Sequence, residues 1–148
     1  MKQEIFDFLK SKRTCVLAVE MMDGSPHAAT VHFAHGEDPL VFYFETQNDY
    51  RKYEPLAGRE KTRASLVVGT DESTMKTLQL DGEVSIITPS EKNQWAKIYL
   101  GNFPEKEKKS SDPKFVFFKF TPTWWRFTDW TKPEGKLILL SDKVDFKL

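Results

Sequence analysis

The feature that most constrains the fold of this chain is the repeated alternation of short strand-like segments with turns. The segments rich in β-branched and aromatic residues are 14–20, 27–33, 40–45, 64–69, 77–88, 115–120, 123–129 and 136–140. Helical patterns are fewer and short, and they cover 2–11, 49–56 and 91–100. Strands that follow one another with only short helices between them are typical of an antiparallel barrel or sandwich, so the sequence predicts a mainly β fold.

Turn residues predict how the strands are connected. The stretch MDGSP indicates a hairpin between the first two strands, and HGEDP forms the next turn. The pair Asp81-Gly82 leaves two alternatives open, because segment 77–88 is either a hairpin about this pair or one long strand with a glycine inside it.

The two later helices have recognisable boundary residues. Asp49 is expected to cap the helix at 49–56, and Pro55 is expected to limit its length. Ser90 is expected to cap the helix at 91–100.

Length and charge narrow the classes of function. The 148 residues fit one domain, 1–148, and 22 basic residues balance 22 acidic ones, which argues against a nucleic-acid partner or a membrane-attracted surface. The first residues, MKQEIFDFLK, are too charged for a signal peptide, and no apolar run approaches the roughly 20 residues of a membrane helix. The single cysteine, Cys15, cannot form an internal disulfide. We therefore expect a soluble, cytoplasmic domain.

Several common kinds of site have no sequence signal. Neither common glycine-rich phosphate motif is present, and no serine has the Gly-x-Ser-x-Gly context of a hydrolase. His27 and His32 fall on opposite faces of one strand, so with His35 they predict solvated or hydrogen-bonded imidazoles and no metal site. Cys15 is expected to be a buried, inert thiol.

The stretch FYFETQNDYRKYEPL (42–56) has the donors that a phosphate group needs. Thr46 offers a hydroxyl, Arg51 a planar fork of donors and Lys52 a point charge. A helix that begins near Asp49 would add free backbone N–H groups. The alternative is an exposed, capped helix whose two cations meet only water.

The order of the motifs along nearly the whole chain resembles that of the FMN-binding split-barrel family, the pyridoxamine 5′-phosphate oxidase-like proteins. The chain is most similar to the short, single-domain members called general stress proteins. The motifs that carry the resemblance are RTCVLAVEMMDGSPHAATVHF, LVFYFETQNDYRKYEPL, RASLVVG, LQLDGEVSI and FKFTPTWWRFTDW. The resemblance implies a six-stranded antiparallel split barrel, FMN as cofactor, and one long strand at 77–88.

The resemblance also implies which residues bind the flavin. Strands 27–33 and 40–46 would flank it, and Tyr50 occupies the position where the family usually has a serine. The implied cofactor-binding residues are Thr30, Val31 and His32 at the ring and ribityl chain, Thr46, Tyr50, Arg51 and Lys52 at the phosphate, and Phe44, Trp124 and Trp125.

The aromatic stretch TPTWWRFTDW indicates a covered surface. Trp124 and Trp125 point to opposite sides of a strand, so one can enter the core while the other faces outward. By resemblance, the protein would be a homodimer with the flavin at the subunit interface, and this segment would close over the flavin of the other chain. The alternative is one core and one interface tryptophan that do not contact a cofactor. Arg126 and Asp129 are expected to form a structural ion pair. The resemblance is not taken to imply that this chain oxidises vitamin B6.

Four functions follow from these observations. The first is an FMN-dependent oxidoreductase acting on an unidentified small molecule, in which His32 and Tyr99 are the only candidates for acid–base work. The second is a non-catalytic, stress-related flavin-binding module. The third is a protein that binds the deazaflavin F420, for which Lys61 and Arg63 would supply extra cations. The fourth is a small nucleic-acid-binding barrel, which the zero net charge disfavours.

Overall fold

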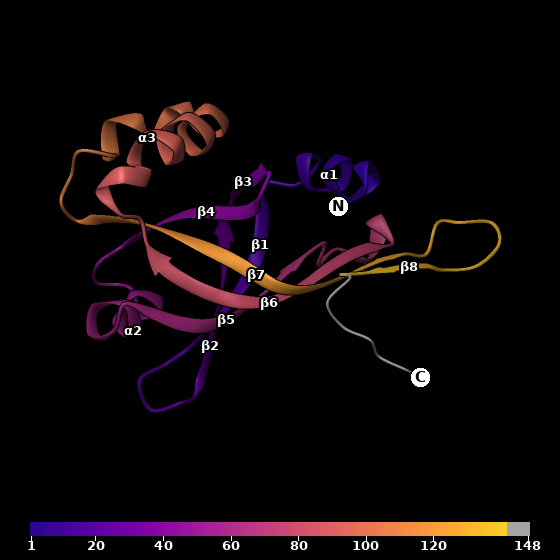
Figure 1. Ribbon diagram of the computed structural model, residues 1–148, viewed down its shortest axis with the longest axis horizontal. Coiled ribbons are helices and arrows are strands. Elements are labelled where there is room, and N and C mark those ends of the chain that lie inside the picture. Colours follow the sequence, from indigo (N-terminus) through magenta and orange to yellow (C-terminus); the bar gives the residue numbers. More distant parts are fainter. Residues whose placement is uncertain (142–148) are drawn as a thin grey trace.

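The computed structural model describes residues 1–141, and its main feature is one curled antiparallel sheet with short helices around it (Figure 1). The strands are β1 (Thr14–Glu20), β2 (Pro26–His32), β3 (Ala34–Glu37), β4 (Leu40–Gln47), β5 (Lys61–Val68), β6 (Lys76–Ile86), β7 (Phe115–Asp129) and β8 (Leu137–Leu140). Neighbours in the sheet follow the order β2-β1-β5-β6-β7-β4-β3, and β8 also pairs with β7. The predicted mainly β split barrel is confirmed, although the sheet has eight strands and not six.

The helices are short, as the sequence predicts. They are α1 (Gln3–Lys10), η1 (Arg51–Tyr53), α2 (Glu54–Gly58), η2 (Glu72–Thr74), η3 (Pro89–Glu91), α3 (Lys92–Trp95), η4 (Ala96–Leu100) and η5 (Pro104–Lys109). The amphipathic α1 buries Ile5 and Leu9 on one face, which confirms the helix predicted at 2–11.

Two of the predicted helix caps are wrong. The helix predicted at 49–56 is a 3₁₀ turn followed by α2, and the carboxylate of Asp49 pairs with Lys114 at 3.5 Å. Pro55 lies in the first turn of α2, where its missing N–H costs nothing, and so it does not end the helix. The helix predicted at 91–100 is capped by Thr88 through a capping box with Glu91, and not by Ser90.

The pair Asp81-Gly82 lies inside one continuous strand, β6, as the family resemblance implies. The register between β6 and β7 shifts at this pair, which marks a β-bulge. A Cβ atom on Gly82 would lie 2.2 Å from the carbonyl oxygen of Thr121, so only glycine fits this close approach. Gly82 pairs with Pro122 in β7, and this strand runs unbroken where the sequence predicted two strands.

Two hydrophobic clusters lie on opposite faces of β4. Its inward residues, such as Phe42 and Phe44, belong to the main core enclosed by the curled sheet. On the outer face, Tyr43 packs against the segment 89–112 between β6 and β7, here called the insert. The members of this second cluster are Ala34, Tyr43, Trp95, Tyr99 and Phe103. In Figure 1 the insert is the group of short helices around α3.

Candidate functional site

The residues predicted at a phosphate lie where β4 ends. The 3₁₀ turn η1, which holds Arg51 and Lys52, contacts both β2 and β4. Thr46 is buried near the end of β4, and its hydroxyl donates a long hydrogen bond of 3.4 Å to the carbonyl of Gln47. The structure therefore brings the predicted phosphate-binding segment against the predicted flavin strand β2.

Lys52 is a half-buried cation that has no anion beside it among residues 1–141. Its Nζ lies 4.6 Å from the centroid of the Tyr50 ring, over the π face. Burial alone lowers the pKa of the Lys52 ammonium, and within the described part of the chain no carboxylate offsets this. An anion bound next to Nζ would compensate this loss of hydration. Arg51 and Tyr50 are exposed, so both remain accessible to a ligand.

The predicted ring-facing residues lie on β2, at one end of the sheet order. Val31 points into the main core, whereas Thr30 and His32 are exposed on the other face. Although His32 is exposed overall, partial desolvation of its imidazole lowers its pKa, and the nearby cations Lys106 and Arg13 act in the same direction, which favours the neutral imidazole.

The structure does not bring all predicted residues together within one chain. The ring of Phe44 is fully buried and stacks on Phe118, so only its backbone faces away from the core. Trp125 packs against the main core, and Trp124 lies on the outer face of β7. Strands β1, β5 and β6 lie between β2 and β7 in the sheet order, so the strand that carries Trp124 is not paired with the strand that carries Thr30.

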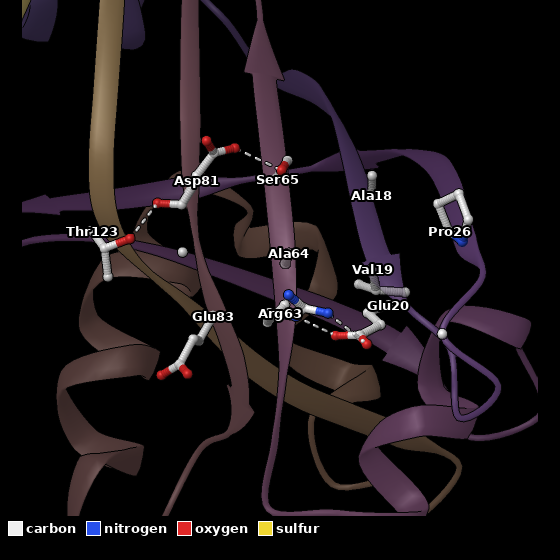
Figure 2. A pocket seen from close by; sticks show the side chains of 12 residues that line it. Ala18, Val19, Glu20, Pro26, Arg63, Ala64, Ser65, Asp81, Glu83 and Thr123 are labelled. Carbon is white, nitrogen blue, oxygen red and sulfur yellow. Dashed lines mark hydrogen bonds and ion pairs between the residues drawn. The ribbon is translucent and has the colours of Figure 1, made fainter. Parts of the chain in front are cut away.

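A broad depression on the outer face of β1, β5 and β6 has a volume of about 600 Å³. Figure 2 shows Arg63 reaching across to Glu20, and its Nε and Nη2 donate to the two carboxylate oxygens at 2.6 and 3.0 Å. Beside this pair, the Ser65 hydroxyl donates to Asp81 at 2.7 Å. Small side chains such as Ala18 leave the space between these groups open.

None of the ten predicted cofactor-binding residues lines this depression. Cross-strand pairing nevertheless places Trp124, Asp81, Ser65 and Ala18 in one row, because paired residues project to the same face. The sequence did carry a signal for this surface, since small or polar residues alternate with apolar ones along these strands. Of the residues that line the depression, the sequence indicated only Arg63 as a ligand contact, as a cation for a longer ligand.

Residues 1–141 contain no cluster of three or more histidine, cysteine or acidic side chains that could hold a metal ion. Within the same range, no helix is long and apolar enough to cross a membrane.

A comparison with models of protein families gives one match. The family model described as pyridoxamine 5′-phosphate oxidase matches residues 1–129. No curated protein matches the sequence.

Solved structures share the fold at low sequence identity. A Clostridium acetobutylicum protein related to general stress protein 26 is 18% identical, with a TM-score of 0.65 over 92% of this chain and 91% of its own. A pyridoxamine 5′-phosphate oxidase-related, FMN-binding protein from Nostoc punctiforme is 16% identical, with a TM-score of 0.68 over 97% and 91%. A haem-binding protein from Mycobacterium smegmatis is 14% identical, with a TM-score of 0.72 over 90% of this chain and 54% of its own.

Proposed function

The chain belongs to the pyridoxamine 5′-phosphate oxidase family, and on that premise we propose that it binds FMN and acts as a flavin-dependent oxidoreductase on a small molecule. The observation that carries the proposal is the half-buried ammonium of Lys52, which lies next to β2 and has no carboxylate partner in the described part of the chain. A phosphate monoester supplies the anion that this cation lacks. Thr46 and Arg51 add a hydroxyl and a guanidinium at the same end of β4.

The residues around this point fit the rest of an FMN molecule. β2 and β4 approach each other next to η1, so a ligand anchored at Lys52 can extend along the exposed side of β2 past Thr30 toward His32. FMN supplies the electron-transfer chemistry when bound, and the protein chain positions it and excludes water. A neutral His32 can accept a hydrogen bond or a proton near the ring.

The proposed site is completed by a second copy of the chain. Within one chain, Trp124 lies on β7, which is not paired with β2, and it is not among the residues next to η1. Trp124 shares its outer face with the depression at Arg63 and Ser65, a surface broad enough to receive a partner. We therefore place the flavin at a homodimer interface, with Trp124 of one subunit close to β2 of the other.

Replacing Trp124 by alanine is expected to weaken the dimer by about 2 kcal/mol or more, the loss typical of an interface tryptophan. Trp125→Ala is the matched control, because Trp125 packs against the core and its loss should lower the free energy of unfolding instead. Sedimentation velocity over a range of concentrations measures the dissociation of the dimer, and urea unfolding measures the free energy of unfolding. A wild-type protein that sediments as a monomer, or a Trp124→Ala dimer as tight as wild type, would contradict the proposed interface.

The absorbance spectrum of the purified protein, before and after addition of FMN and filtration, tests the cofactor. Retained flavin bands at about one flavin per subunit are expected, since each subunit carries one Lys52 site. Retention of F420 and not FMN would favour the deazaflavin, although Lys61 and Arg63 are already paired with Glu83 and Glu20. A Soret band would indicate haem, and a colourless protein that retains none of these would reject the proposal.

Turnover separates an oxidoreductase from a non-catalytic flavin module. The bound flavin should be reduced by a physiological electron donor and reoxidised by a defined acceptor over many cycles. Flavin that stays bound but does not cycle with any donor would favour the non-catalytic module.

A further inference from the structure

A buried ion pair holds the insert against the outer face of β4. The Nζ of Lys106 lies 3.0 Å from Oε1 of Glu45, and it donates a hydrogen bond of 2.9 Å to the hydroxyl of Tyr99. The side chains of Lys106 and Glu45 are only 16% and 10% exposed, whereas most other ion pairs of the described chain lie at the surface. Burying two charges costs hydration that their attraction barely repays, so stability alone does not account for this pair.

The ring of Phe103 connects this ion pair to His32. Phe103 is buried, and the Nζ of Lys106 lies 5.0 Å from its centroid. On its other side, the edge of the ring meets the imidazole of His32 at a centroid distance of 5.4 Å. Tyr99 also packs on Phe103, at 5.0 Å. The wall behind His32 is therefore fixed by the same residues that hold Lys106.

Four charged groups face His32 from the elements around it. Arg13 precedes β1, Glu45 lies on β4, and Glu105 and Lys106 lie on η5. Arg13 stacks on the ring of Phe103 at 4.8 Å, but it is well exposed and forms an ion pair with Glu105 at 3.4 Å. Solvent and this carboxylate therefore screen the charge of Arg13 from His32. Lys106 is the cation of this group that is shielded from solvent.

We propose that Lys106 is a positioning residue for the flavin-facing histidine: with Glu45 and Tyr99 it fixes Phe103 against the imidazole of His32, and it places a cation shielded from solvent behind that ring. The consequence for chemistry rests on the proposed function. A neutral imidazole beside the flavin can accept a proton or a hydrogen bond, whereas an imidazolium cannot. The cation of the insert thus favours the neutral form of a residue on β2, although the two are far apart in the sequence.

An NMR titration of the three histidines in the flavin-free protein tests this inference. The signal of His32 is assigned from a His32→Gln variant. In Lys106→Met, His32 should titrate at higher pH than in wild type, because a shielded cation is lost and Glu45 is left without its partner. Lys106→Arg keeps the charge and should restore the wild-type titration. Lys108→Met, on the exposed side of η5, is the matched control and should leave the titration of His32 unchanged.

Two further measurements distinguish a failure of the inference from a variant that does not fold and from a protein that does not bind FMN. If Lys106→Met does not fold, the double variant Glu45→Gln/Lys106→Met removes both charges of the ion pair. This variant should still raise the pKa of His32, since the lowering effect of Lys106 on that pKa is larger than the raising effect of Glu45. A His32 titration that is unchanged in a folded Lys106 variant would overturn the inference. FMN binding by the wild-type protein is measured independently, so its absence would reject the proposed function and leave the titration result intact.

Discussion

Replacing Phe44 by alanine is expected to lower the free energy of unfolding by about 3–5 kcal/mol, the loss typical of a buried phenylalanine. The side chain of Phe44 is fully buried, and its ring stacks on that of Phe118 with centroids 5.1 Å apart. Truncation to alanine leaves a cavity that the surrounding strands β4 and β7 cannot close, because their hydrogen-bonded register is fixed. Urea unfolding followed by circular dichroism measures this loss.

Phe44→Leu is the matched variant, since it retains most of the apolar volume. It should cost much less stability and leave FMN affinity unchanged, because the side chain at this position points into the core and only the backbone faces the proposed site. A Phe44→Leu protein that is stable but has lost FMN would show that the ring itself contacts the cofactor. Phe44 was predicted from family resemblance to bind the cofactor, and this pair of variants tests that role.

The local pattern of residues predicted the strands well where β-branched and apolar residues form a short run between polar ones. Segment 14–20 is such a run, and β1 covers the same residues. The prediction was less complete where turn residues occur inside strands. Residues of HGEDP form part of β3, because pairing with β4 outweighs their preference for turns. The proline in β7 is tolerated because it lies at the bulge opposite Gly82.

The candidate site also has one part that the sequence indicates and another that only the fold reveals. Thr46, Arg51 and Lys52 are close in sequence, so the change from strand to turn could indicate a phosphate site directly. The depression on the outer face takes its residues from several strands, and it emerges only from the register that aligns Ala18, Ser65 and Asp81. Contacts such as that between Lys106 and Glu45 depend on how the insert folds back on β4, which local patterns do not specify.

Replacing Lys52 by alanine is expected to weaken FMN binding by about 1–3 kcal/mol, which is the range for a hydrogen bond to a charged group. This corresponds to a loss of roughly five-fold to 150-fold in affinity. The half-buried ammonium has no carboxylate partner among the described residues, so its removal should cost the folded protein little. Fluorescence quenching of the flavin upon titration with protein measures the dissociation constant, and urea unfolding verifies that stability is retained.

Lys114→Ala is the matched control for this variant. Lys114 lies at the same end of the sheet, its backbone accepts a hydrogen bond from Asn48, and its ammonium pairs with Asp49 at the surface. Removal of this charge should leave FMN affinity nearly unchanged, because a solvated pair contributes little at a distance. If Lys52→Ala binds FMN as tightly as Lys114→Ala does, Lys52 is an ordinary surface cation and the phosphate lies elsewhere. If Lys52→Ala alone loses affinity and riboflavin, which lacks the phosphate, binds both variants equally, the contact is with the phosphate itself.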